Sequence, residues 1–143
     1  MSSRHIARER AIQLLFQLDY NEAEDLEKAF DGFWGSFGDK PDVRLFADEL
    51  VHGVLEHRDN LDLEIQRYAK NWDIKRMGGV DRNVLRLALY EIQHRKDIPP
   101  VVSVNEAIEL AKELSSDEAA KFVNGILDRA IKDAGRPLRT PMQ

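Results

Sequence analysis

The stretch Ile98–Asp128, IPPVVSVNEAIELAKELSSDEAAKFVNGILD, predicts two consecutive amphipathic helices joined by a short polar corner. Apolar residues recur at helical spacing from Val104 to Leu114 and again from Ala119 to Ile131. No part of the chain alternates apolar and polar residues as a half-buried strand would. The sequence therefore indicates an all-α fold.

Local signals predict where these two helices begin. Pro99-Pro100 forces an extended backbone before the first of them. Ser103 lies three residues before Glu106, and Ser115 lies three residues before Glu118. This is the capping-box spacing, in which a serine and an acid satisfy the first free N–H groups of a helix. We therefore expect one helix to begin at each serine.

Gly125 lies inside the second predicted helix. A glycine there costs about 1 kcal/mol relative to alanine, so some feature of the fold should offset it. We expect a close approach by another helix. The helix should end near Gly135, because Pro137 prevents a restart.

The same periodicity extends over the rest of the chain and predicts a compact bundle of about seven helices in two packed three-helix units. We expect a single domain over residues 1–135, with subunits of about 1–57 and 58–135 and a flexible tail over 136–143. The predicted helices are 6–20, 22–37, 43–57, 59–72, 80–94, 103–114 and 115–135.

Composition excludes several classes of protein. The 143 residues are 43% apolar and 33% charged, which is ordinary for a globular domain. No cysteine is present, so disulfides, thiolate metal sites and thiol nucleophiles are excluded. No apolar run approaches the roughly 20 residues that span a bilayer. We expect a cytoplasmic protein with no membrane association.

The net charge of −5 conceals two basic islands. Residues 1–18 carry three basic residues and one acidic residue, and residues 67–86, which include Arg76, carry six and two. Basic islands on an acidic protein indicate a localised anion site. The alternative is that the two basic islands are ordinary helix faces exposed to water, with no bound anion.

The first predicted helix carries a possible nucleic-acid site. Arg4 and Arg8 lie one turn apart near its N-terminus, where cations oppose the helix dipole at a cost of about 0.3–1 kcal/mol each. Phe16 points away from the apolar face of the same helix. Guanidinium groups for phosphate and an exposed ring for a base are the requirements of a single-stranded nucleic-acid site.

Catalytic motifs are not evident, and we predict that the chain is not an enzyme and holds no cofactor. It has no glycine-rich phosphate loop, zinc motif or nucleophile elbow. Glu49–His52 and Glu91–His94 repeat the Glu-x-x-His spacing of di-metal helical bundles, which leaves such an enzyme as an alternative. The polar residues that follow His94 argue against it.

Four motifs resemble one known family. VDRNVLRLALYEI at 80–92, DIPPVVSVNEAIELAKEL at 97–114 and KFVNGILDRA at 121–130 resemble the C-terminal half of the NusB family of bacterial transcription antitermination factors. RERAIQLLFQLDY at 8–20 resembles that family's opening helix. The corner Ser115–Glu118 departs from the glycine-rich turn that many members carry.

The resemblance implies a function without catalysis. It implies recognition of single-stranded boxA RNA together with a small-subunit ribosomal protein acting as NusE, and entry into an RNA polymerase antitermination complex on ribosomal RNA operons. A helical protein-interaction module without RNA binding is the alternative. We expect RNA contacts from Arg4, Arg8, Phe16, Arg76, Lys121 and Phe122, and partner contacts from Asp81 and Glu118.

Overall fold

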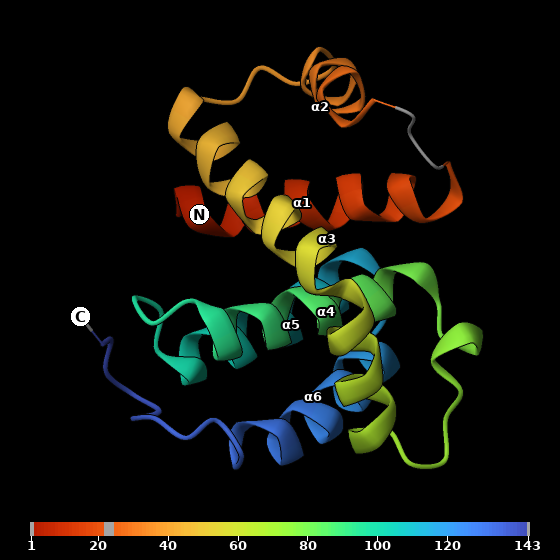
Figure 1. The fold of residues 1–143 in the computed structure, drawn as a ribbon, viewed down its shortest axis with the longest axis vertical. Helices are drawn as coiled ribbons and strands as arrows, with labels where there is room; N and C mark the ends of the chain where they lie inside the picture. The colour runs from red at the N-terminus through yellow and green to blue at the C-terminus, as the bar shows by residue number, and fades with distance from the viewer. Residues whose placement is uncertain (1, 22–24, 143) are drawn as a thin grey trace.

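The computed structural model describes residues 2–21 and 25–142, and the regular structure of these residues is entirely helical. The predicted all-α fold is confirmed. In Figure 1, α1 runs across the upper half, α3 crosses it, and α4, α5 and α6 pack in the lower half. The elements are α1 (Ser3–Tyr20), α2 (Leu26–Trp34), α3 (Pro41–Tyr68), the short 3-10 helix η1 (Ile74–Arg76), α4 (Gly79–His94), α5 (Pro100–Leu114) and α6 (Asp117–Ile131).

One long helix replaces two predicted ones. We expected helices over 43–57 and 59–72, but α3 continues for 28 residues through the predicted break. No glycine or proline lies between Val54 and Tyr68, and Asp59 is exposed to water inside the helix rather than capping its start. The predicted subunit boundary at 57/58 thus falls within α3. The predicted start of the second helix, Glu22, lies outside the described residues.

The predicted capping boxes are both wrong. α5 begins at Pro100, because a proline at the first helical position needs no N–H partner and already has helical φ. Ser103 is therefore inside the helix and buried. At the next corner the cap is Ser116, whose hydroxyl accepts a hydrogen bond from the N–H of Ala119 at 3.0 Å.

The close approach expected at Gly125 is also wrong. A Cβ atom built on Gly125 would meet nothing within 4 Å. The tight contact lies instead at Gly53 in α3, where a methyl group would overlap the ring of Tyr90 on α4. Gly125 faces open space.

The interior contains a buried ion pair that joins α1 to α4. Arg8 donates to Glu91 through Nε at 2.8 Å and Nη2 at 3.0 Å, and both residues are buried. The hydroxyl of Ser103 on α5 donates to the same carboxylate at 2.7 Å. The expectation that Arg8 contacts RNA is therefore wrong, because Arg8 is buried and Glu91 neutralises it inside the core.

A second charged network lies where α1, α3 and α4 meet. Arg86, which is 6% exposed, donates two hydrogen bonds to Asp62 at 2.6 and 2.9 Å. Its remaining terminal nitrogen donates to Asp19 at 2.9 Å, and Asn83 donates to Asp19 at 2.8 Å. Three helices thus converge on one guanidinium group.

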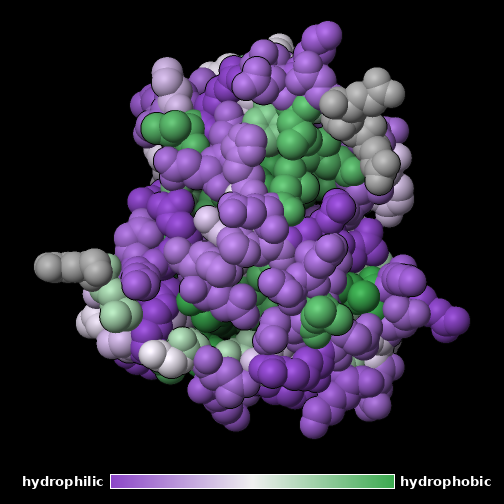
Figure 2. Space-filling model, viewed as in Figure 1, coloured by the Kyte–Doolittle hydropathy of each residue, from purple (hydrophilic) through white to green (hydrophobic). Residues whose placement is uncertain are grey.

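The surface that covers this interior is mostly hydrophilic in the view of Figure 2, with its largest apolar area in the upper half between α2 and α1. No helix in the described part of the chain is both long and apolar enough to span a membrane.

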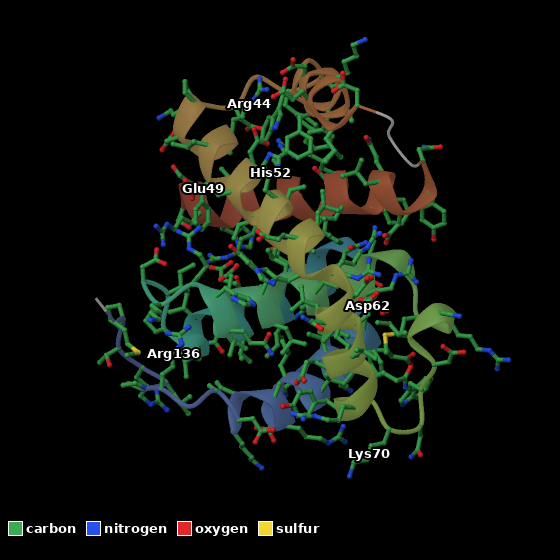
Figure 3. All side chains as sticks on the ribbon, viewed as in Figure 1. Arg44, Glu49, His52, Asp62, Lys70 and Arg136 are labelled. Carbon is green, nitrogen blue, oxygen red and sulfur yellow. The ribbon has the colours of Figure 1, made fainter. Side chains whose placement is uncertain are left out.

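Residues 136–142, which we expected to form a flexible tail, lie against the turn between α4 and α5. The N–H of Val101 donates to the Leu138 carbonyl at 3.0 Å, and the N–H of Met142 donates to the Lys96 carbonyl at 2.7 Å. Arg136 points at the end of α4 (Figure 3), where it donates to the carbonyls of Ile92 at 3.1 Å and Arg95 at 3.1 Å. A guanidinium group there satisfies carbonyls that lack helical partners.

Arg136→Ala should lower the free energy of unfolding by about 1–2 kcal/mol, because it removes charged hydrogen bonds to the last carbonyls of α4. Urea denaturation followed by circular dichroism measures the loss. Arg139→Ala, which removes an exposed arginine three residues on, is the matched control and should leave the midpoint unchanged. Equal midpoints for the two variants would contradict a capping role.

Candidate nucleic-acid interface

Three of the predicted RNA-binding residues lie on α1, and the structure does not bring them together. Arg4 lies in the first turn, and Phe16 follows twelve residues later, about 18 Å along the helix axis. The Arg4 guanidinium lies 4.4 Å from the centre of the Phe46 ring and 3.6 Å from Asp97. Arg4 is exposed but has local partners, whereas Arg8 is inside the core. The predicted arginine pair does not form one solvated site.

Four other predicted residues meet at one place. A hollow of about 420 Å³ lies between η1, the start of α4 and the start of α6, and we call it the Arg76 hollow. The residues that line it include Arg76, Asp81, Glu118 and Phe122. Two of these were predicted to contact RNA and two to contact a partner protein. The fold therefore places both predicted surfaces side by side.

An aromatic pair forms one wall of the Arg76 hollow. The rings of Trp72 and Phe122 pack edge to face, with an angle of 73° between their planes and 5.3 Å between their centres. Trp72 is 60% exposed, and Lys121 next to Phe122 is also exposed. The sequence analysis placed Trp72 at the end of the predicted helix 59–72 and did not assign it to the site. Its polar neighbours Lys70, Asn71 and Asp73 were the available signal that the ring faces solvent.

Phe16 is 38% exposed, as we expected, but it also packs. Its ring lies over Gly79, where an added Cβ would be 2.8 Å from the ring, and its centre is 5.0 Å from that of Tyr20. Gly79 follows Gly78, which lines the Arg76 hollow. One face of Phe16 thus covers the start of α4, beside the hollow.

The two carboxylates of the Arg76 hollow differ in environment. Glu118 is exposed, whereas Oδ1 of Asp81 is buried and has no hydrogen-bond partner among the described residues. Burial raises the pKa of Asp81, and the Ser115 side chain offsets part of that rise. A buried acceptor without a donor is costly, so Asp81 is suited to receive a hydrogen bond from a bound molecule.

The di-metal alternative does not fit the geometry. Glu91 is bonded to Arg8 and Ser103, and Glu49, labelled with His52 in Figure 3, accepts a hydrogen bond from Arg95 at 3.1 Å. Neither carboxylate of the two Glu-x-x-His units is free to bind a metal ion.

A group of side chains close enough together to hold a metal ion occurs instead at the start of α1, where His5 lies near Glu109 and Glu113. Both ring nitrogens of His5 already face carboxylates, Glu106 at 2.5 Å and Glu113 at 3.1 Å. Burial lowers the pKa of His5, but the hydrogen bonds that its ring donates to Glu106 and Glu113 outweigh this effect and raise the pKa. The arrangement is that of an imidazolium ion pair, which joins α1 to α5.

The comparisons with known proteins agree with the fold and with the sequence motifs. The model of the NusB family matches residues 5–132. The transcription antitermination protein NusB of Myxococcus xanthus is 46% identical over 140 residues, which cover 96% of this chain and 100% of that protein. That of Bacillus subtilis is 47% identical over 133 residues, which cover 91% of this chain and 95% of that protein.

Solved structures give the same result. T. maritima NusB is 37% identical, with a TM-score of 0.80 over 93% of this chain and 92% of that one. A chain in a crystal structure of the antitermination factors NusB and NusE in complex with dsRNA is 29% identical. Its TM-score is 0.80 over 93% of this chain and 98% of that chain.

Proposed function

This chain belongs to the NusB family of transcription antitermination proteins, and from that premise we propose that it binds a boxA-type single-stranded RNA together with a small-subunit ribosomal protein acting as NusE. In this proposal the pair joins an RNA polymerase antitermination complex on ribosomal RNA operons in the cytoplasm. The family is one of transcription factors rather than enzymes, so the prediction that this chain is not an enzyme is confirmed.

The observation that best supports the proposal is the Arg76 hollow. Its aromatic wall, Trp72 and Phe122, offers ring faces to unpaired bases, which stack on aromatic side chains without base pairing. Arg76, and Lys121 beside Phe122 in the sequence, supply positive charge for phosphates. Asp81 and Glu118 face the same space and can accept hydrogen bonds from a protein partner.

We propose that a strand bound at the Arg76 hollow continues past Phe16 along α1. Phe16 lies over Gly79 at the edge of this hollow, and Arg4 is exposed at the far end of the same helix. We assign these two residues to outer contacts of the RNA and Arg8 to the core.

The decisive experiment is a titration with RNA in the presence and absence of the ribosomal partner. A single-stranded boxA oligonucleotide, a scrambled strand of equal length and a duplex of the same sequence are compared at low and moderate salt. The duplex is included because the complex of the similar structure contains dsRNA. We expect the boxA strand to bind most tightly, and the partner to increase its affinity.

Absence of RNA binding at low salt, with partner binding retained, would contradict the proposal. That result would favour the alternative of a helical protein-interaction module. Equal affinity for the three RNAs would retain RNA binding but remove the boxA specificity.

Arg76→Ala and Lys121→Ala should each weaken binding of every RNA and reduce the salt dependence of the affinity. The expected change in slope is about 0.7 per lost phosphate contact on a single strand. Both side chains are exposed, so the melting temperatures should stay near that of the wild type. Lys96→Ala, at the turn between α4 and α5, is the charge-matched control. If Lys96→Ala reduces the salt dependence of RNA affinity as much as the other two variants do, the net charge of the protein alone explains the effect.

A further inference from the structure

A second hollow lies on the other side of the Trp72–Phe122 pair. It has a volume of about 360 Å³ and is open to solvent between the end of α3 and the outer face of α6. Gly125 lies in its lining, and we call it the Gly125 hollow. Its volume is within the range of about 300–1,000 Å³ that small-molecule sites occupy.

The charge of the Gly125 hollow is opposite to that of the whole chain. Lys70, Lys121 and Arg129 line it, and no carboxylate does, on a protein with a net charge of −5. None of the three makes an ion pair within 4 Å among the described residues. Lys70 lies at the lower end of the molecule in Figure 3. Such a concentration of cations favours an anionic ligand.

The aromatic wall of the Gly125 hollow is held in place. The N–H of Trp72 donates to the Ala69 carbonyl at 2.7 Å. The side chain of Gln66 donates to the Trp72 carbonyl and accepts from the N–H of Ile74 at 3.0 Å. A 60% exposed ring thus projects from a turn whose backbone is fixed on both sides. An ordered, exposed aromatic ring is suited to stacking on a base.

Gly125 keeps the space beside this wall open. No atom would contact a Cβ on Gly125, so packing does not explain a glycine that costs the helix about 1 kcal/mol. A larger side chain would project into the hollow beside Phe122. The helical cost of Gly125 is offset if the bare backbone admits a ligand.

We propose that the Gly125 hollow is a nucleotide-binding site, in which one unpaired base of the RNA contacts Trp72 and Phe122 and its phosphates bind Lys70 and Lys121. This inference rests on the proposed RNA binding and extends it from Lys121 and Phe122 to Lys70, Trp72 and Gly125, which the sequence analysis did not assign to RNA. Arg129 is a fixed part of the rim, because its Nη1 donates to the Tyr68 carbonyl at 2.6 Å.

The first test fills the hollow without disturbing the core. Gly125→Leu should fold at least as stably as the wild type and bind a single-stranded boxA oligonucleotide at least tenfold more weakly. Gly32→Leu is the matched control, because Gly32 is an exposed helical glycine in α2 whose Cβ would also meet nothing within 4 Å. Its RNA affinity should equal that of the wild type.

The second test does not depend on Gly125. Stacking should quench the fluorescence of Trp72 when the same oligonucleotide binds. The other tryptophan, Trp34, is buried and donates to Asp48 at 2.8 Å, so its emission should not change. Trp72→Phe should abolish the quench and retain most of the affinity, whereas Trp72→Ala should lose roughly tenfold to a hundredfold.

The outcomes separate the two proposals. Unchanged affinity for Gly125→Leu, with wild-type binding intact, would overturn the nucleotide site and leave RNA binding at the Arg76 hollow. Absence of a Trp72 quench would remove base stacking on this ring from both hollows. Failure of the wild type to bind RNA at low salt would overturn both. If Gly125→Leu folds poorly, Lys70→Ala decides the question, because the exposed Lys70 lines the Gly125 hollow but not the Arg76 hollow. An RNA affinity and a salt dependence equal to those of the wild type would then overturn the nucleotide site.

Discussion

Arg8→Met should lower the free energy of unfolding by about 3–5 kcal/mol, which is the cost of leaving one member of a buried ion pair without its partner. Glu91 is 1% exposed and receives two hydrogen bonds from Arg8. Without the guanidinium it keeps only the hydroxyl of Ser103. Urea midpoints and melting temperatures measure the loss.

A double variant is the control for this prediction. Arg8→Met combined with Glu91→Leu removes both charges and fills the space with apolar groups, so it should recover a large part of the lost stability. If Arg8→Met alone melts like the wild type, Glu91 is not held as a buried anion. RNA affinity should be compared only among variants that are folded at the assay temperature.

Arg86→Met should also cost about 3–5 kcal/mol at neutral pH, because Asp62 and Asp19 would both lose the buried guanidinium group between them. Asp19 would keep Arg82 at 3.3 Å, whereas the ion pair of Asp62 would be lost. Arg44→Met is the control. Arg44 forms exposed ion pairs with Asp31 and Asp48, and pairs of this kind contribute about 0.2–1 kcal/mol.

The pH dependence distinguishes the Arg86 effect from lost packing. Burial raises the pKa of Asp19, but the hydrogen bond from Asn83 and the charge of Arg86 outweigh it and hold the pKa below its ordinary value of about 4. Asp19 therefore stabilises the wild type above about pH 4, and this contribution is lost as the pH falls through the lowered pKa.

In Arg86→Met the carboxylates of Asp19 and Asp62 no longer have the charge of Arg86 beside them, so they should take up protons more readily. The deficit relative to the wild type should then shrink between pH 7 and pH 4, measured as the difference in urea midpoints. A deficit that is constant over this range would assign the loss to packing alone.

Helical periodicity was sufficient to predict the fold class and most helices, because apolar spacing is a local property of the chain. It failed where the signal was indirect. Asp59 is a good cap in isolation, yet the buried Val54 and Leu61 on either side keep α3 continuous. Arg8 and Glu91 are 83 residues apart in sequence, so no local pattern showed that they form a pair.

The candidate site was predictable in part. The basic island pointed to Arg76, and the family resemblance pointed to Asp81, Glu118 and Phe122. The fold brings all four to the Arg76 hollow. Trp72 was missed because a tryptophan at helical spacing is usually core, and here the helix ends four residues earlier. The predicted close approach at Gly125 was wrong because the sequence does not show whether another helix packs against that face of α6.

The continuity of α3 has a mechanical consequence. At 28 residues it is about 42 Å long, and it extends through both halves of the molecule (Figure 1). Its first half holds α2 through the hydrogen bond from Trp34 to Asp48, and its second half holds α4 through Asp62. Separating either half from the other would expose buried apolar side chains of α3 to water. We therefore expect one cooperative melting transition, with the slowest amide exchange in the central turns of α3.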